Sequence, residues 1–249
     1  MITKAQLKEY ASLKEKKYRS ALGKIFVEGK RLVEDALQSN YTCEAILATE
    51  NFLDSHSLGF LSSHEVETIS EKEFKLLSDT QTTQGIGAVL QVPVFHTNIN
   101  SIDTNCVLYF DEIRDPGNAG TMIRTAAWFG IKDIIVSKNS VDVFNPKVVR
   151  SSMGALFLMN IIEDDGCFGK IVEAKKSGFQ IVGAELSGEN IFTFTPSAKT
   201  LILMGSEADG ISAGLKTYID AFVTIPKRGM GESLNVGVAA SIIISQLQK

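Results

Sequence analysis

Residues 106–137 read CVLYFDEIRDPGNAGTMIRTAAWFGIKDIIVS, and this stretch carries the pattern that decides the fold. An apolar run at 106–110 is followed by a turn, a stretch with helical spacing at 119–130, and a second apolar run at 133–137. Short apolar runs that alternate with helices are typical of parallel strands buried on both faces. The stretch therefore predicts one strand–helix–strand unit of an α/β fold.

The helix inside this unit can be read geometrically. Asp115, Pro116 and Gly117 predict a turn, and Asn118 is expected to be the N-cap. Apolar residues then recur at helical spacing in one stripe: Ala119, Met122, Ile123, Ala126, Ala127 and Gly130. At about 100° per residue, Arg124 lies roughly 125° from the centre of that stripe and Trp128 almost opposite it. We therefore expect Trp128 to face a second covering layer or a partner subunit.

The remaining carboxyl-terminal sequence repeats this alternation. We expect helices near 146–152 and 168–178 and strands at 156–162, 179–185, 201–205 and 221–225. A final helix follows, with Ser233 as its expected N-cap. Nine of the last seventeen residues are apolar and occupy most of the helix circumference, which predicts that this helix is covered on more than one side.

The first third of the chain is organised differently. It suggests a charged helix at 3–18, a helix after Gly29, strands at 43–48 and 85–92, and a helix at 71–79. The polar stretch 93–105 has no period and contains Pro93 and three Asn residues, which is typical of a linker. We therefore predict a domain at 1–95, a linker at 96–105 and a second domain at 106–249.

Composition excludes several classes of protein. The 249 residues are 44% apolar and 22% charged, which rules out a disordered or fibrous chain. No apolar run approaches the roughly 20 residues needed to cross a bilayer, and the first twenty residues lack the apolar core of a signal peptide. We therefore expect no membrane association and a cytoplasmic location.

The cysteine and histidine positions argue against a metal site. Cys43, Cys106 and Cys167 are widely spaced without a CxxC pair, so we expect buried free thiols rather than a disulfide framework or a zinc site. The three histidines are scattered without ligand spacing, which makes a metal or a Ser-His-Asp triad unlikely as a basis for the chemistry.

Charge is distributed unevenly along the chain. The net charge of −4 speaks against a nucleic-acid partner, but residues 1–31 contain nine basic and three acidic side chains. That segment therefore carries +6, which leaves −10 for the rest. Such asymmetry is typical either of a basic face that meets an anion or of an amphipathic helix in solvent.

Three loops follow predicted strands and are the candidate site. They read DEIRDPGN at 111–118, GSEADGIS at 205–212 and PKRGMGES at 226–233. Ligands of parallel α/β sheets bind outside the carboxyl ends of the strands. Gly205 would let backbone approach a ligand closely, and Glu207 is a plausible site carboxylate, although a lone loop Glu is usually only solvated. The glycines at 229 and 231 lack the third glycine of a dinucleotide loop, and no Walker lysine motif occurs.

Together, NAGTMIRTAAWFG, LILMGSEADGIS and IPKRGMGESLNVGVAAS resemble the three motifs of the SpoU (TrmH-type) branch of the SPOUT methyltransferases. That family methylates the ribose 2'-hydroxyl of RNA from S-adenosylmethionine. The resemblance covers residues 106–249 and implies a parallel α/β sheet with a deep carboxyl-terminal trefoil knot and a homodimer through this domain. Residues KYRSALGKIFVEGKRLVEDAL and TTQGIGAVLQVP resemble the family's appended small α/β domain, which is similar to a ribosomal protein that binds kinked RNA.

The resemblance also assigns roles to individual residues. The cofactor contacts are expected at six positions: Leu203, Met204, Gly205, Ile225, Ser233 and Leu234. The catalytic group is expected to be Arg124 with Asn118, Glu207 and Asn235. The RNA contacts are expected at Lys17, Arg19, Lys30 and Arg31.

The role of Arg124 has two interpretations. The family account makes it the base that takes the 2'-hydroxyl proton, but an arginine pKa above roughly 12 favours a phosphate or oxyanion contact. The sequence departs from the family at Lys227 and Arg228, where a small apolar residue is common, and at Gly237, where serine is frequent. A glycine there costs the helix up to about 1 kcal/mol, which predicts close packing.

The function expected from the resemblance is S-adenosylmethionine-dependent methylation of a ribose 2'-hydroxyl in structured RNA, with ribosomal RNA as the first choice. Two alternatives stay open at this point. One is a transfer-RNA 2'-O-methyltransferase, and the other is a catalytically silent RNA-binding module.

Overall fold

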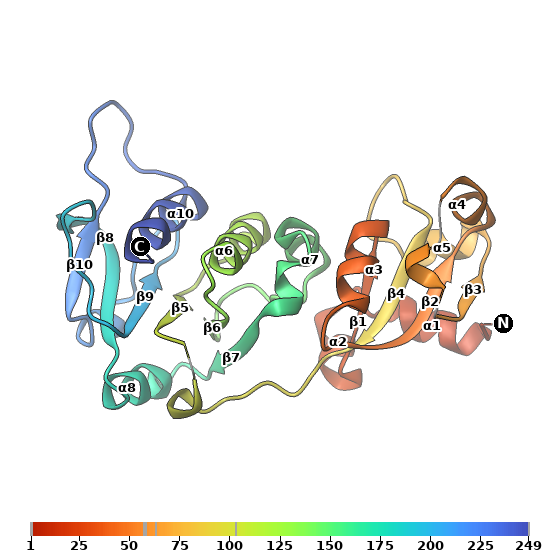
Figure 1. Ribbon diagram of the computed structural model, residues 1–249, viewed down its shortest axis with the longest axis horizontal. Coiled ribbons are helices and arrows are strands. Elements are labelled where there is room, and N and C mark those ends of the chain that lie inside the picture. Colours follow the sequence, from red (N-terminus) through yellow and green to blue (C-terminus); the bar gives the residue numbers. More distant parts are fainter. Residues whose placement is uncertain (1, 57–58, 63, 103, 249) are drawn as a thin grey trace. The chain divides into compact units, whose positions relative to one another are not determined.

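A computed structural model describes residues 2–56, 59–62, 64–102 and 104–248, which form two compact units (Figure 1). The first unit contains the chain up to Val94 together with Asp142–Phe157. The second contains Phe95–Val141 and the chain from Leu158 onward. One helical excursion, 142–157, therefore leaves the second unit and packs in the first.

The second unit is built on a six-stranded parallel sheet with strand order β10-β8-β9-β5-β6-β7. The strands are β5 (Cys106–Phe110), β6 (Asp133–Ser137), β7 (Asn160–Asp164), β8 (Gln180–Asn190), β9 (Thr200–Met204) and β10 (Ala221–Thr224). This arrangement confirms the α/β fold with a parallel sheet that the apolar runs predicted. β8 is longer than expected, and its pairing with β10 contains an irregularity at Phe222 and Val223.

Helices cover both faces of this sheet, which explains why the central strands β5 and β9 are buried along their whole length. α6 (Pro116–Trp128) and α10 (Val236–Leu247) lie on one face, while α8 (Gly169–Lys176) and the short helix η2 (Ile99–Ser101) lie on the other (Figure 1). A further short helix, α9 (Ala213–Lys216), follows β9. The predicted stripe of α6 is confirmed for Ala119, Met122, Ile123 and Ala126, which are fully buried. Ala127 is half-buried, and Gly130 is exposed beyond the end of the helix.

The apolar run at 156–162 is not one strand, contrary to expectation. Its first part lies in a short 3-10 helix, η3 (Ala155–Leu158), and β7 begins only at Asn160. The left-handed backbone of Met153 and Gly154 turns the chain at this point. Phe157 then packs edge-to-face on Tyr41 within the first unit, with 5.2 Å between ring centroids. The residues of this one apolar run thus pack in two different places, a 3-10 helix in the first unit and a strand in the second.

The polar stretch 93–105 is held to the second unit by hydrogen bonds. The Ile99 backbone N–H donates to Glu173 Oε1 at 2.7 Å, and the His96 N–H donates to Asn160 Oδ1 at 3.0 Å. Ile99 itself is buried in the apolar core beside Ile171 and Phe179. Among the described residues of the stretch, 93–98, 102, 104 and 105 lie outside helices and strands.

The first unit has a mixed four-stranded sheet with order β1-β4-β2-β3. Its strands are β1 (Lys24–Glu28), β2 (Thr42–Ala48), β3 (Val66–Thr68) and β4 (Ile86–Gln91); β4 runs antiparallel to β1 and β2, and β3 is parallel to β2. Its helices are α1 (Lys4–Ser12), α2 (Lys16–Leu22), α3 (Lys30–Leu37), α4 (Glu50–Ser55), η1 (Gly59–Leu61), α5 (Glu71–Leu77) and α7 (Pro146–Ser152).

The charged amino-terminal segment is part of this fold. Instead of one helix at 3–18, two helices meet at a break after Ser12, and this break lets Leu13 turn inward. Tyr10 and Leu13 are buried in a core with Phe74 and Leu77 of α5. The basic residues of this segment therefore lie on two helices that pack against α5.

The cysteines are free but only partly buried. Cys106 is buried, Cys43 is intermediate and Cys167 is exposed, so the expectation of buried thiols is wrong for Cys167. Burial raises the pKa of the Cys106 thiol to about 12. Within the described ranges, no group of three or more His, Cys, Asp and Glu side chains could hold a metal ion. No helix among the described residues is long and apolar enough to span a membrane.

Candidate functional site

The three candidate loops leave the sheet at one edge. β5, β9 and β10 run parallel, so the loops after Phe110, Met204 and Thr224 all start from the carboxyl edge. α6 follows the first loop and α10 follows the third, and the two helices are joined by a hydrogen bond between Thr125 Oγ1 and Ser241 Oγ at 3.0 Å. The topology therefore brings the loops and both helix N-termini together.

Asn118, Glu207 and Asn235 form a chain of hydrogen bonds across these loops. Asn118 Nδ2 donates to Glu207 Oε1 at 2.6 Å, and Asn235 Nδ2 donates to Asn118 Oδ1 at 2.9 Å. Glu207 and Asn235 lie 89 and 117 residues after Asn118 in the chain. Glu207 and Asn235 are exposed and Asn118 is half-buried, so the cluster faces solvent, where a substrate can reach it.

Both helices begin at a residue other than the one expected. Asp115, not Asn118, is the N-cap of α6, since its Oδ1 accepts the Asn118 backbone N–H at 2.8 Å and Pro116 occupies the first helical turn. Asn235, not Ser233, is the N-cap of α10, and its Oδ1 accepts the N–H groups of Gly237 and Val238. These capping bonds hold Asn118 and Asn235 at the first turns of their helices. From there the Asn118 amide reaches Glu207, and the Asn235 amide reaches Asn118.

Asp111 holds the first and second loops together, and the sequence reading had not singled it out. Its backbone N–H donates to Met204 O at 2.9 Å, and its Oδ2 accepts the Ser212 N–H at 2.7 Å. Asp111 is buried, and burial raises its pKa above the usual range. A charged residue placed directly after a buried strand is the signal that could have identified it.

The predicted cofactor residues divide into a buried strand end and an open loop. Leu203 and Met204 are buried in β9, and Gly205 continues them without a side chain. A Cβ at Gly205 would lie 2.3 Å from the backbone carbon of Gly210 and 2.4 Å from its oxygen. Ser206 and Gly210 close this loop with two backbone hydrogen bonds of 3.0 and 3.1 Å. Only glycine fits at position 205.

The other cofactor positions lie in the chain between β10 and α10, which projects from the second unit (Figure 1). Ile225 is half-buried at the end of the strand, whereas Ser233 and Leu234 are exposed. The apolar side chains of Met230 and Leu234 are open to solvent in this loop. They offer exposed apolar contact area in the third loop.

Arg124 lies outside the hydrogen-bonded cluster. It is exposed on α6, almost two turns beyond Asn118, and forms no ion pair or hydrogen bond with any described residue. Its guanidinium is therefore free to bind a ligand. Its predicted catalytic role stays a prediction.

Gly237 is closely packed, as the sequence predicted. A Cβ at this position would lie 3.2 Å from Asn235 Oδ1 and 3.4 Å from both Asn118 Oδ1 and Thr121 Cβ. Glycine thus lets α10 approach α6 behind the two asparagines.

The predicted RNA contacts belong to the first unit, and three of the four present their charge to solvent. Lys17 pairs with Glu15 at 3.2 Å, and the Lys17 ammonium lies 4.6 Å from the centre of the Tyr18 ring. Lys30 Nζ lies 5.8 Å from the centre of the Phe60 ring, and Arg31 is exposed at the start of α3.

Arg19 has a structural environment instead. Its side chain is only 6% exposed, and its Nη1 donates to the carbonyls of Leu13 and Lys14. Its Nη2 pairs with Asp142 Oδ2 at 2.5 Å. These bonds tie α2 to the break after α1 and to the 142–157 excursion, so the guanidinium cannot meet RNA without giving them up. The expectation of an RNA contact at Arg19 is corrected accordingly.

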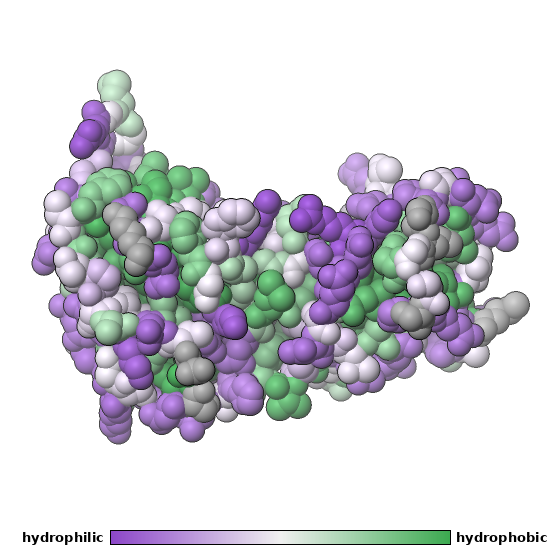
Figure 2. Space-filling model, in the orientation of Figure 1, coloured by the Kyte–Doolittle hydropathy of each residue, from purple (hydrophilic) through white to green (hydrophobic). Residues whose placement is uncertain are grey.

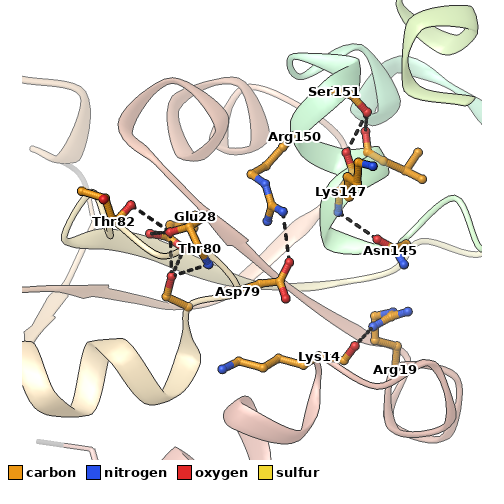
Figure 3. Close-up of polar contacts among 12 residues, drawn as sticks. Lys14, Arg19, Glu28, Asp79, Thr80, Thr82, Asn145, Lys147, Arg150 and Ser151 are labelled. Atoms are coloured by element: carbon orange, nitrogen blue, oxygen red, sulfur yellow. Dashed lines mark hydrogen bonds and ion pairs between the residues drawn. The ribbon is translucent and has the colours of Figure 1, made fainter. Parts of the chain in front are cut away.

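Glu28 organises the loop that precedes β4 and was also missed. Its carboxylate accepts hydrogen bonds from Ser78 Oγ at 2.5 Å, Thr80 Oγ1 at 3.3 Å and the Gln84 N–H at 3.0 Å. Figure 3 shows Glu28 beside Thr80 and Thr82, with Asp79 turned the other way toward Arg150 of α7. A buried carboxylate thus shapes the loop 78–85 next to the start of α3.

These features define an α/β enzyme whose site is assembled by three loops at the carboxyl edge of a parallel sheet. The chain belongs to the SpoU rRNA methylase family, whose model matches residues 105–245, more than half of its length. A second family model, the MRM3-like substrate binding domain, matches residues 4–88. The resemblance seen in the sequence is thereby confirmed.

Individual relatives extend over the whole chain. It is 30% identical to the 23S rRNA (guanosine(2553)-2'-O)-methyltransferase RlmP of Bacillus subtilis, with 98% of this chain and 96% of that protein covered. Among solved structures it is similar to a TrmH-family protein of Porphyromonas gingivalis, with a TM-score of 0.85, 33% identity and 99% and 98% of the two chains covered. It is also similar to the SpoU methyltransferase AviRb of Streptomyces viridochromogenes in complex with AdoMet, with a TM-score of 0.85, 26% identity and 98% and 97% covered.

Proposed function

We propose that this protein transfers a methyl group from S-adenosylmethionine to a ribose 2'-hydroxyl of ribosomal RNA. The observation that carries the proposal is the hydrogen-bonded cluster of Asn118, Glu207 and Asn235, gathered from three loops at the carboxyl edge. Family membership and the relative that methylates 23S rRNA support the same reaction.

The residues at this edge fit S-adenosylmethionine. The cofactor carries no phosphate, so the lack of a glycine-rich phosphate loop is no obstacle. The close approach at Gly205 would present the backbone after Met204 to the adenine, and Leu234 would add apolar contact. Glu207 supplies a carboxylate compatible with the positive sulfonium. When bound, the cofactor supplies an electrophilic methyl carbon.

The side chains of the cluster would orient the ribose. The Asn235 amide is fixed by its capping bonds, and the Asn118 amide is held by Glu207 and Asn235, so both need little reorganisation on binding. As the 2'-oxygen forms its bond to the methyl carbon, the bond from that carbon to the cofactor sulfur would break, and the hydroxyl proton would pass to solvent at this exposed cluster. Arg124 would bind the adjoining phosphate and stabilise the negative charge that develops on that oxygen.

We propose further that the chain after β10 forms the trefoil knot implied by the family. The return of α10 to pack against α6, away from the edge strand β10 that precedes it, supports this. The first unit would select the RNA, and ribosomal RNA as the substrate would place the protein in the cytoplasm.

Methyl transfer from tritiated S-adenosylmethionine tests the proposal. The acceptors are ribosomal RNA and transfer RNA purified from a strain that lacks the protein, followed by mapping of the methylated ribose. Label in ribosomal RNA at a 2'-oxygen supports the proposal. Label only in transfer RNA would identify the alternative substrate, and no binding of S-adenosylmethionine at millimolar concentration would leave a silent RNA-binding module.

Half-buried Lys30 and exposed Arg31 at the start of α3 should contribute to RNA affinity. The double variant Lys30→Gln/Arg31→Gln should reduce the slope of log K against log salt for RNA binding by about 2, because each phosphate contact releases about one counterion. Filter binding to 23S rRNA transcribed in vitro measures this slope. Lys72→Gln/Lys75→Gln, the same charge change on α5, should keep the wild-type slope. Equal slopes for both variants would contradict the assignment. Deletion of residues 1–20 is a poorer test, since it removes core residues.

We also propose a homodimer through the second unit. Trp128 is 85% exposed on α6, and Val238 is exposed on the neighbouring helix α10, where Figure 2 shows apolar residues at the surface. An exposed tryptophan beside apolar residues is typical of an interface. Both observations agree with the over-apolar final helix.

The variant Trp128→Glu should convert the dimer to a monomer, because a charge cannot be buried there without a partner. Sedimentation velocity gives the mass in solution. Leu186→Glu, on the similarly exposed surface of β8, is the matched control and should stay dimeric. A wild type that sediments as a monomer would refute the dimer directly.

A further inference from the structure

Glu112 has a backbone conformation that stability does not explain. It follows β5 with φ of 55°, in the left-handed region that non-glycine residues rarely adopt. Its N–H donates to Ser137 Oγ at 2.9 Å, and the next N–H, of Ile113, donates to Ser140 Oγ at 3.2 Å. The two serines are hydrogen-bonded to each other at 3.0 Å. The turn is therefore clamped from the end of β6.

The clamp directs the Glu112 carboxylate to two exposed side chains. Oε1 accepts Asn139 Nδ2 at 3.0 Å, and Oε2 forms an ion pair with Arg114 Nη2. The bonds from Asn139 and Arg114 hold the pKa of Glu112 below its usual range, so it is ionised at neutral pH. One corner of the Arg114 guanidinium is thus fixed, although its side chain is 61% exposed.

The rest of the Arg114 guanidinium is free. It has five N–H donors in a rigid fork, and within the described part of the chain only the bond to Glu112 is formed. An exposed ion pair adds little to stability. The Glu112–Arg114 pair alone therefore does not offset the free-energy cost of the left-handed backbone at Glu112. Strained, preorganised side chains of this kind are typical of ligand contacts.

The position of Arg114 indicates which ligand it meets. It directly precedes Asp115, the N-cap that fixes the Asn118 backbone, so it lies at the start of the helix that carries Asn118 of the cluster. Lys138 is exposed at the end of the neighbouring strand β6. When a ribose of the RNA binds at the cluster, the adjoining phosphates lie along the carboxyl edge of the sheet. The planar guanidinium of Arg114 can donate two parallel hydrogen bonds to such a phosphate.

We propose that Arg114 binds a backbone phosphate of the substrate RNA next to the reacting nucleotide, and that Glu112 positions it. This inference rests on the proposed function, because it takes the ribose to bind at the cluster. Arg114 is an RNA-positioning residue in this role and takes no part in bond making.

Kinetics and salt dependence test the inference together. Arg114→Gln should raise KM for 23S rRNA transcribed in vitro by up to about tenfold, leave kcat within about twofold, and lower the salt slope of RNA binding by about 1. Arg114→Lys should restore the slope, but only part of the affinity, because an ammonium cannot bind phosphate bidentately. Glu112→Gln keeps the Arg114 cation and should retain the wild-type slope.

Controls separate this role from a structural one. Lys132→Gln removes a cation at the amino end of β6, at the opposite edge, and should change neither KM nor slope. S-adenosylmethionine affinity and melting temperature should match the wild type in every variant. Wild-type KM and slope in Arg114→Gln would overturn the inference, as would a loss of cofactor binding in that variant. If the wild type transfers no methyl group but Arg114→Gln still lowers the salt slope, the proposed function fails while the RNA contact stands.

Discussion

The variant Arg124→Lys is expected to lower kcat for methyl transfer to RNA by about 100-fold or more, the usual cost of removing one preorganised donor to a developing oxyanion. Lysine keeps the charge but loses the planar fork, so it cannot bind a phosphate and a neighbouring oxygen at once. Because Arg124 lies on α6, outside the loops that would hold the cofactor, the dissociation constant for S-adenosylmethionine should stay within about twofold. Single-turnover kinetics and calorimetry give the two quantities separately.

The pH dependence of the residual activity decides between the two roles of Arg124. A lysine with an ordinary pKa near 10.4 could act as a base at high pH, so a base role predicts that Arg124→Lys recovers activity as the pH rises toward 10. A role in binding phosphate and oxyanion predicts a constant deficit across that range. Lys176→Arg on α8 is a matched control and should behave as the wild type. Unchanged kcat in Arg124→Lys would contradict both roles.

The periodicity of the sequence predicted α6, α8 and α10 and the strands of the second unit, but not the short helices η2 and α9. The stripe of α6 is buried and Trp128 is exposed, because both follow from helical geometry alone. The strand boundaries were less predictable. At 156–162 the apolar residues serve two different cores, and no local pattern distinguishes such a run from a strand.

The helix caps illustrate a different limit. Asp115 and Asn118 are both good capping residues, and so are Ser233 and Asn235. The choice depends on which side chain is needed elsewhere. Asn118 is at the third helical position because its amide joins Glu207 and Asn235, a tertiary contact that short-range preferences do not contain.

Charge was the least informative property of the sequence. The basic amino-terminal segment begins with a packed pair of helices, in which the Arg19 guanidinium forms internal hydrogen bonds and an ion pair. Lys17, Lys30 and Arg31 lie at the surface. Buried carboxylates such as Asp111 and Glu28 contribute to the acidic count but accept internal hydrogen bonds instead of lying on the surface. The net charge of −4 thus averages groups with opposite structural roles.

The variant Gly205→Ala is expected to abolish cofactor binding in the usual concentration range while leaving a folded protein. The new Cβ would meet the Gly210 backbone at 2.3 and 2.4 Å, and no flexible side chain is present to move aside. The loop 205–210 must then open, and the cost of overpacking is about 1–3 kcal/mol. If that cost falls on the bound state, affinity for S-adenosylmethionine drops by roughly 10- to 100-fold.

Two measurements separate this local effect from unfolding. Calorimetry should show the weakened binding, while RNA binding through the first unit and the helical circular dichroism should persist. Gly169→Ala, at the start of α8, is the matched control, because its Cβ would meet nothing within 4 Å and its cofactor affinity should be unchanged. Wild-type affinity in Gly205→Ala would show that the loop after β9 takes no part in holding the cofactor. That result would remove the geometric support for a site at the end of β9, because the packing of Gly205 against the Gly210 backbone sets the shape of the loop that would meet the ligand.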